Sequence, residues 1–397
     1  MKKILLIVIA LIIMVSGIYA WAEEAGEEPA PPLPPDRPSY IKDLIQKMKD
    51  GDWELRSRVY NEFVRLKAKD SIPGLMELLK FKEANVRELS AKILGVLGVK
   101  EAIPEIKKLI KDKDSGVRGG AAFACGYLGV KDKDVIPDIM KMLKALEVEV
   151  RINAAIALGK LGVKEAIPEF KKMLKDTNSD IRCAGIEALG LIGEKEMVSN
   201  LMKLLNDKDI NVRGKSAEAL GNMGIKNAIP EIIKLLDNIE NKNIRPLIVR
   251  ALGKLKAKEA IPDLVNLLED KNVRREIITT LGSFDANDVK DAIPEIIKLI
   301  NDADVNIRMV AMATLSKLGA QDAVPELLKL LNDRDSKNWV IIAVAGITIV
   351  ELGAKDKIDA KKFADFLNQI LKKAIDLDDD LITRARNALK ELGYPEE

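Results

Sequence analysis

The chain has 397 residues, of which 47% are hydrophobic, 4% are aromatic and 32% are charged, and it contains no histidine. The lack of histidine removes the commonest general base and the commonest metal ligand, which counts against many classes of enzyme. The 64 basic and 62 acidic side chains leave a formal net charge of +2. A nucleic-acid-binding protein usually carries a strong basic excess, so no nucleic-acid partner is predicted.

The first residues have the pattern of an export signal. Lys2 and Lys3 precede an apolar run from Ile4 to Val15, and an Ala-x-Ala sequence ends at Ala22. This order predicts a secretory signal peptide over residues 1–22 that is cleaved before Glu23, and hence a periplasmic or secreted protein. The alternative is an uncleaved anchor, which is the one way in which we expect the chain to contact a membrane.

An acidic, proline-rich segment follows over residues 23–38, EEAGEEPAPPLPPDRP. A segment of this composition cannot bury enough apolar surface to form a core. We therefore expect a semi-rigid, extended linker, with a ligand for a proline-binding domain as the alternative.

Prolines that follow Ile or Val then recur along the rest of the chain. The intervals between them are 31, 33, 31, 62, 32, 32 and 31 residues, and Ser199 stands where the double interval lacks its proline. These prolines are Pro73, Pro104, Pro137, Pro168, Pro230, Pro262, Pro294 and Pro325. A fixed period of this length is typical of a solenoid.

Each repeat contains two apolar segments with helical spacing, and their ends carry helix signals. The proline falls in the first turn of the first segment, where its missing N–H costs little. Leu-Gly pairs such as Leu161-Gly162 and Leu318-Gly319 are typical of a helix C-cap. We predict an all-α fold of about eleven antiparallel helix pairs over residues 39–397, with the apolar segment 338–353 buried and the last pair capping the stack.

Aspartate and arginine recur at fixed offsets from the proline, eight and fourteen residues on. Aspartates in the turn before the second helix can cap N–H groups and meet an arginine of their own or of the adjacent repeat. The predicted ladder comprises Asp112, Arg118, Asp176, Arg182, Asp207, Arg213, Asp302 and Arg308.

The combination of proline, aspartate, Val-Arg and an Ala-rich helix that ends in Leu-Gly resembles the HEAT repeat, especially its phycobilisome-lyase-like subclass. The resemblance covers about residues 40–393 and implies a right-handed α-solenoid. Members of that broad family include scaffolds, phycobilin lyases and a di-iron hydroxylase. The hydroxylase binds iron through His-Glu motifs, so a chain without histidine cannot share its activity.

No motif in the sequence predicts a catalytic residue, a metal site or a cofactor. The segment Arg213–Ser216 (RGKS) lacks the earlier glycine of a phosphate-binding loop, because Asp209 stands there. The segment 376–380 (DLDDD) lacks the glycine and glutamate of a calcium loop. Cys125 and Cys183 lie two repeats apart, too far for a disulfide, and are predicted to be buried.

The second helices are expected to line the concave surface, and positions two, five and nine after each arginine share one face of the helix. We predict a protein-binding groove from Leu89, Val96, Phe123, Tyr127, Asn153, Ile156, Lys160, Glu187 and Leu191. The alternative is that these side chains pack inside the stack. The predicted function is a non-catalytic, extracytoplasmic interaction scaffold; the alternatives are a lyase-like enzyme that uses the same groove, or a membrane-tethered spacer.

Overall fold

The computed structural model describes residues 37–66, 68–331, 339–373 and 379–394. Over these residues the chain forms twenty-two α-helices and short 3-10 turns, with no strand, which confirms the prediction of eleven helix pairs. Contacts divide the chain into two compact units, one up to Ile225 and one from Lys226. The predicted signal peptide and nearly all of the predicted linker lie outside the described residues, and the first described helix begins at Arg37.

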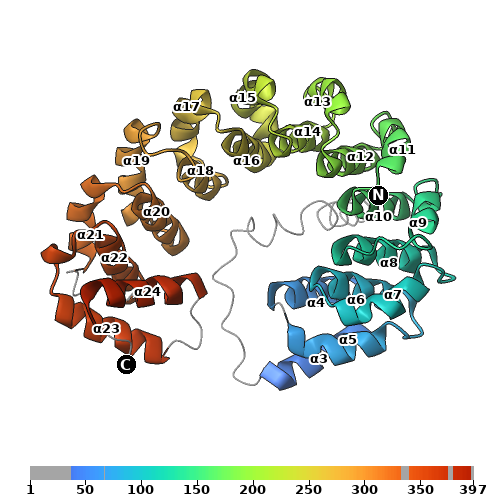
Figure 1. Cartoon of the computed structure of the whole chain (residues 1–397), viewed down its shortest axis with the longest axis horizontal. Helices are drawn as coiled ribbons and strands as arrows, with labels where there is room; N and C mark the ends of the chain where they lie inside the picture. Colours follow the sequence, from blue (N-terminus) through green and yellow to red (C-terminus); the bar gives the residue numbers. More distant parts are fainter. Residues whose placement is uncertain (1–36, 67, 332–338, 374–378, 395–397) are drawn as a thin grey trace. The chain divides into compact units, whose positions relative to one another are not determined.

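The first unit contains six helix pairs in two layers (Figure 1). The first helices form the outer layer: α3 (Arg37–Asp50), α5 (Ile72–Leu78), α7 (Ile103–Leu109), α9 (Ile136–Met142), α11 (Ile167–Met173) and α13 (Val198–Leu204). The second helices form the inner layer: α4 (Trp53–Leu66), α6 (Ala84–Val96), α8 (Ser115–Leu128), α10 (Val148–Leu161), α12 (Ser179–Ile192) and α14 (Ile210–Asn222). Each second helix from α8 to α12 packs against the second helix on either side.

The second unit contains five further pairs. Its first helices are α15 (Ile229–Asp237), α17 (Ile261–Asn266), α19 (Ile293–Lys298), α21 (Val324–Leu331) and α23 (Ala360–Lys373). Its second helices are α16 (Arg245–Leu255), α18 (Arg274–Leu281), α20 (Val305–Lys317), α22 (Trp339–Glu351) and α24 (Asp379–Leu392). Three 3-10 turns fill the irregular spacings within these pairs: η6 (Ile239–Ile244), η8 (Leu267–Glu269) and η10 (Leu299–Asn301).

The repeated residues determine where the helices begin and end. Proline occupies the first turn of most first helices, directly after a 3-10 turn such as η3 (Lys164–Ala166). Glycines with positive φ end many of the second helices, among them Gly162 at φ +68° and Gly319 at φ +63°. Both features match the prediction, since proline tolerates a position without an N–H partner and glycine adopts the left-handed conformation without strain.

A row of glycines that the sequence analysis missed sets the distance between second helices. A β-carbon on Gly126 of α8 would lie 2.6 Å from the Cα of Ala157 on α10, and one on Gly159 would lie 2.7 Å from the Cα of Ala188 on α12. Gly95 meets Ala124 in the same way. Because there is no room for a side chain at these positions, neighbouring second helices approach backbone to backbone.

Most of the apolar segment near the C-terminal end is buried as predicted, but Trp339 at its start is 45% exposed. Every residue of α22 from Ala343 to Val350 is buried, and the helix packs against α20, α21 and α24. The segment 332–338 that precedes it lies outside the described residues. Nowhere in the described ranges does a helix combine the length and the apolar character needed to cross a membrane.

Candidate partner-binding surface

The nine residues of the predicted groove lie on four successive second helices, α6, α8, α10 and α12, but they do not share one environment. Four of them are buried between helices: Leu89, Phe123, Asn153 and Ile156 are each 2% exposed or less. The prediction that these four side chains face a partner is therefore wrong. Each of these second helices packs against neighbouring second helices and is covered by the first helices, so the side chains at positions two and five after the arginine are mostly in the interior; Glu187 is the exception.

The remaining five predicted residues reach the surface. Val96, Tyr127, Lys160 and Leu191 occupy the same repeat position on four consecutive helices, nine residues after the arginine. The first three are partly exposed and Leu191 is 45% exposed. We call these four residues the exposed row. Glu187 lies one turn before Leu191 on α12 and is also partly exposed.

An aromatic pair and a lysine form the centre of the exposed row. The rings of Phe123 and Tyr127 lie 4.5 Å apart between centroids, and the Lys160 ammonium lies 4.0 Å from the centroid of the Tyr127 ring. A cation over the face of an aromatic ring is attracted by the ring quadrupole. The ring of Tyr127 thus packs against the buried ring of Phe123 on one side and contacts the Lys160 ammonium group.

Lys160 has no carboxylate in contact. No described residue accepts a hydrogen bond from its ammonium group or forms an ion pair with it. Burial lowers the pKa of Lys160, and the nearby Glu187 carboxylate opposes this effect only through space. The charge is therefore partly withdrawn from water without a counter-ion.

Two other lysines of the inner layer are buried and fully paired. Lys92 donates to Glu88 at 2.7 Å and to Glu149 at 3.0 Å, and Lys215 lies 3.0 Å from Glu218 and 3.5 Å from Glu187. Burial would lower the pKa of each lysine, but the two carboxylates beside each one raise it above its usual value. Burial raises the pKa of Glu88.

Glycines of α8 make room for the Lys92 cluster. A β-carbon on Gly120 would lie 2.6 Å from Cγ of Glu88, and one on Gly116 would lie 2.9 Å from a carboxylate oxygen of the same residue. Glu88 therefore lies across a face of α8 without side chains, and Lys92 reaches past α8 to Glu149 on α10. Consecutive glycines at Gly119 and Gly120 are the signal in the sequence for this close approach.

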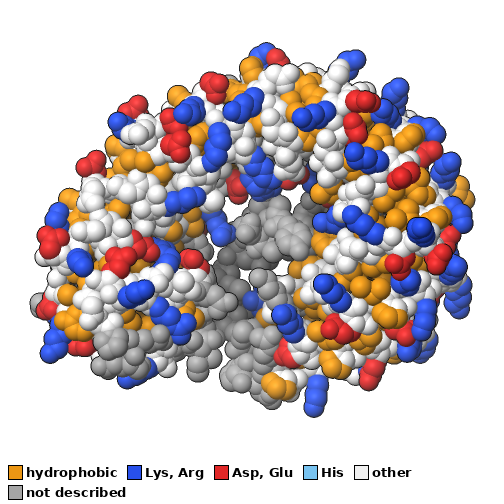
Figure 2. All heavy atoms as spheres, in the orientation of Figure 1, with side chains coloured by type: hydrophobic (Ala, Val, Ile, Leu, Met, Phe, Trp, Pro, Cys, Tyr) orange, Lys and Arg blue, Asp and Glu red, His pale blue; other side chains and the backbone are white. Residues whose placement is uncertain are grey.

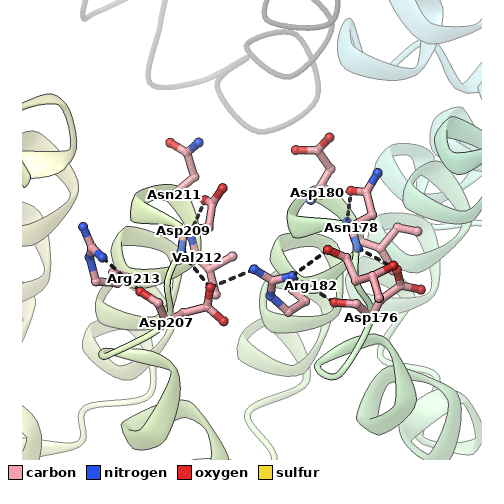
Figure 3. A network of polar contacts seen from close by, with 11 residues as sticks. Asp176, Asn178, Asp180, Arg182, Asp207, Asp209, Asn211, Val212 and Arg213 are labelled. Atoms are coloured by element: carbon pink, nitrogen blue, oxygen red, sulfur yellow. Dashed lines mark hydrogen bonds and ion pairs between the residues drawn. The ribbon is translucent and has the colours of Figure 1, made fainter.

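The Asp/Arg ladder lies in the turns before the second helices and joins adjacent repeats. Arg182 donates to a carboxylate oxygen of Asp207 in the next repeat at 2.7 Å, and to the backbone carbonyl of Asp176 in its own repeat at 2.9 Å (Figure 3). Of the two partners left open by the sequence, the structure shows the aspartate of the following repeat. Arg182 thus bonds to its own turn through a carbonyl and to the next repeat through a carboxylate.

The same pairing between neighbouring repeats joins arginines outside the predicted ladder to an aspartate of the following repeat. Arg87 forms two hydrogen bonds with Asp112, at 2.9 and 3.0 Å, and Arg151 lies 3.5 Å from Asp176. In the second unit, Arg245 pairs with Asp270 at 2.9 Å and Arg274 pairs with Asp302 at 2.6 Å.

For three predicted ladder arginines, Arg118, Arg213 and Arg308, the next repeat has no described aspartate at the corresponding position. Ala145 replaces the aspartate that Arg118 would meet, so Arg118 instead donates to the carbonyls of Asp112 and Lys113. The aspartate eight residues after Pro325, which would meet Arg308, lies in the segment 332–338 outside the described residues. Arg213 donates to the carbonyl of Asp207 at 2.9 Å.

The residues that cap the second helices lie two positions after the predicted aspartates. Asn178 accepts from the N–H groups of Asp180 and Ile181, and Asp209 accepts from those of Asn211 and Val212 (Figure 3). Asp114 and Asp304 also cap α8 and α20, but each accepts from one N–H group, that of Val117 and that of Asn306. The prediction that the ladder aspartates cap the helices is therefore corrected: each accepts instead from the N–H of the capping residue, as Asp176 does from Asn178 at 2.9 Å.

Other features bear on chemistry. Cys125 and Cys183 are free and buried, as predicted. The segment Arg213–Ser216 lies within α14, so it forms no phosphate-binding loop. Over the described residues, no cluster of three or more metal-binding side chains is present.

On the face shown in Figure 2, hydrophobic side chains lie among lysines and arginines over the first unit.

Comparison with known proteins gives repeated matches to one family. A family model of HEAT repeats matches residues 41–126, 103–190, 136–209, 198–272 and 261–346. Among solved structures, the chain is similar to the crystal structure of an engineered protein, at 21% identity and a TM-score of 0.37, over 82% of this chain and 99% of that one. It is also similar to the complex of CpcE and CpcF of phycocyanin lyase from Nostoc sp. PCC7120, at 20% identity and a TM-score of 0.34, over 73% of this chain and 94% of that one. No curated protein matches.

Proposed function

The chain belongs to the HEAT-repeat family, and from this premise we propose that it is a non-catalytic scaffold that binds a protein partner on the exposed row of its first unit. HEAT repeats are helical scaffolds that generally mediate interactions between proteins. The finer proposal concerns which surface of this chain binds, and it depends on the residues of the exposed row.

One observation carries the proposal. At the position nine residues after the arginine, four consecutive helices present Val96, Tyr127, Lys160 and Leu191, and all four side chains reach solvent. Leu191 is one of three large hydrophobic side chains that are strongly exposed over the described residues. Apolar and aromatic side chains at the surface are costly to leave in water, and tyrosine is enriched where partners bind.

The direct test is partner capture by a surface variant. We expect Tyr127→Ser combined with Leu191→Ser to lose the proteins that the wild-type chain captures from an envelope fraction, because the variant removes apolar contact area from the exposed row. Leu146→Ser is the matched control: Leu146 is 95% exposed but lies in the turn before α10, at the other end of that helix from Lys160.

Circular dichroism spectra and melting temperatures establish that both variants fold. Retention of the same captured proteins by the double variant, quantified by mass spectrometry, would exclude the exposed row as the binding surface. Phe123→Ala is unsuitable for this test, because Phe123 is only 2% exposed and its truncation opens a cavity.

We also propose that the protein works outside the cytoplasm. The support is the sequence of residues 1–22, with its two lysines, apolar run and Ala-x-Ala end. N-terminal sequencing of the protein purified from cell fractions tests this. A chain that begins at Glu23 in the extracytoplasmic fraction is expected; an intact N-terminus in the membrane fraction indicates the tethered spacer, and a cytoplasmic chain contradicts export.

A further inference from the structure

The turns that follow the first helices of the first unit carry a row of exposed lysines. Seven residues after the proline, four consecutive repeats have a lysine, and we call these residues the lysine row: Lys80, Lys111, Lys144 and Lys175. They directly follow α5, α7, α9 and α11 of the outer layer (Figure 1). The first three side chains are 71%, 79% and 69% exposed, and Lys175 is also exposed. The charges of the row therefore lie in solvent.

The acids nearest to the row are paired more closely with other lysines. Glu105 lies 2.8 Å from Lys108 of its own helix and 3.9 Å from Lys80 of the preceding repeat. The same arrangement recurs at Asp138 and Glu169, each of which lies closer to a lysine of its own helix than to the row lysine of the preceding repeat. Each of these acids neutralises one lysine, so the row adds a further positive charge per repeat.

The second unit shows that the fold does not require a lysine seven residues after the proline. The residues at this position there are Asp237, Glu269 and Asn301. Asn301 donates a hydrogen bond to Glu326 of the following repeat at 2.6 Å, which replaces the contact between a row lysine and the next acid. Because a neutral amide makes this contact between repeats, stacking of the repeats does not explain the positive charge in the first unit.

The difference in charge extends over the first helices of both units. From one to seven residues after the proline, or after Ser199, the first unit has ten lysines and four acids in the segments 74–80, 105–111, 138–144, 169–175 and 200–206. The second unit has three lysines and six acids in the segments 231–237, 263–269, 295–301 and 326–332. The small net charge of the whole chain thus combines a cationic face on the first unit with an acidic one on the second. Figure 2 shows lysine and arginine side chains along the outer edge of the first unit.

The side chains of this face suit a lipid surface better than a nucleic acid. The five segments of the first unit contain no arginine, whose planar fork suits individual phosphates, whereas lysine presents a hydrated point charge. Their one aromatic residue, Phe170, is buried and cannot stack on a base. Hydrated cations spread over several repeats suit a surface with many negative charges, and anionic lipid headgroups attract each lysine that lies near them.

We propose that the lysine row docks the first unit on a membrane surface that contains anionic lipids. This membrane contact is separate from the anchor considered for residues 1–22, and it goes beyond the proposed function. The two helices of a pair are antiparallel, so the C-terminal ends of the first helices, which carry the lysine row, lie at the other end of the pair from the exposed row. A membrane on the lysine row therefore leaves the exposed row open to a protein partner.

The test measures binding to vesicles by flotation. The chain that begins at Glu23 is used, because it keeps every described residue and lacks the apolar run, which could insert into any bilayer. The vesicles consist of phosphatidylcholine alone or with about 30% phosphatidylglycerol. We expect binding to the anionic vesicles at low salt, no binding to the neutral ones, and release at about 0.5 M salt, where charges are screened within about 4 Å.

Two triple variants with the same change in charge locate the contact. Lys111→Gln, Lys144→Gln and Lys175→Gln together should weaken binding to the anionic vesicles about 100-fold, since each lysine near an anionic surface strengthens binding about five-fold. The matched control is the combination of Lys234→Gln, Lys298→Gln and Lys329→Gln, which removes three exposed lysines from the first helices of the second unit. The control is expected to bind as the wild type does, and circular dichroism spectra establish that both variants fold.

Three results overturn the inference. They are no preference of the wild type for anionic over neutral vesicles, an equal loss of binding in the two triple variants, and binding of a single-stranded DNA oligonucleotide without binding of the vesicles. The Tyr127→Ser, Leu191→Ser variant should bind the anionic vesicles as the wild type does. A failure of the inference therefore leaves the proposed function intact, and a failure of the proposed function leaves the inference intact.

Discussion

The two cysteine thiols, both in the first unit, are expected to be unreactive in the folded protein because they are buried. Burial raises the pKa of both Cys125 and Cys183 to about 12. Because the thiolate is the reactive form, we expect neither residue to be alkylated by iodoacetamide at pH 8 in the folded protein, and both to react after unfolding in urea. Mass spectrometry of the two samples measures this. Rapid alkylation of native Cys125 would show that its helix is open to solvent.

The ion pairs of the ladder make the stability of the fold depend on pH, and the direction of this dependence follows from the pKa of Asp112. Burial alone would raise the pKa of Asp112, but hydrogen bonds from Arg87 and from the N–H of Asp114 hold it below its ordinary value. A lowered folded-state pKa contributes stability that is fully present above the unfolded pKa of about 4 and is lost as the pH falls through the folded value.

Asp112→Asn tests that contribution. It keeps the side-chain oxygen that accepts from Asp114 but leaves Arg87, whose side chain is 9% exposed, without its counter-ion. We expect the free energy of unfolding at pH 7 to fall by about 1 to 3 kcal/mol, and the difference from wild type to shrink below about pH 4. Urea unfolding at pH 7 and pH 3 measures this, with the exposed Asp134→Asn as the control. A difference from wild type that does not change with pH would contradict the assignment.

At the scale of helices, the contact between second helices depends on the glycine row. Gly126→Val places a side chain where a β-carbon would already lie 2.6 Å from the Cα of Ala157. We expect a loss of about 1 to 3 kcal/mol of unfolding free energy, since overpacking forces the helices apart. Gly129→Asn is the matched control. Gly129 has φ +71°, no atom lies within 4 Å of the place where a β-carbon would be, and asparagine tolerates this backbone conformation.

Urea unfolding of the two glycine variants separates packing from backbone conformation. If Gly126→Val unfolds with the wild-type free energy while Gly129→Asn is destabilised, the close contact between Gly126 and Ala157 does not limit how closely α8 and α10 pack. The same measurement on Gly159→Val, one repeat further, should give a similar loss, because Gly159 meets Ala188 at nearly the same distance.

Local signals in the sequence are sufficient to predict where most of the helices begin or end. The first-turn prolines and the terminal glycines act within one helix, so Pro168 and Gly162 appear where they were predicted. Contacts between repeats are harder to predict, because they depend on how the helices stack. Sequence spacing alone does not determine whether Asp176 pairs with Arg182 or with Arg151. For the same reason it does not predict the close contact between Gly126 and Ala157, which lie on different repeats.

For the chain as a whole, the candidate site is narrower than the sequence indicates. A helical face predicts which side chains point the same way, but it does not predict how much of that face the neighbouring helices cover. Positions two and five after the arginine are mostly covered in the first unit, while position nine emerges, from Val96 to Leu191. The repeated residues hold the helices together, and the residues free to vary at position nine are those we propose to bind.

Site-specific photo-crosslinking tests this central proposal most directly. A photoreactive amino acid is placed at Leu191, which lies on the exposed row, or at Leu146, which is also exposed but lies in the turn before α10. After irradiation of cells, we expect one defined adduct from position 191 and none from position 146. The absence of an adduct at 191, or the same adducts from both positions, would contradict binding on the exposed row.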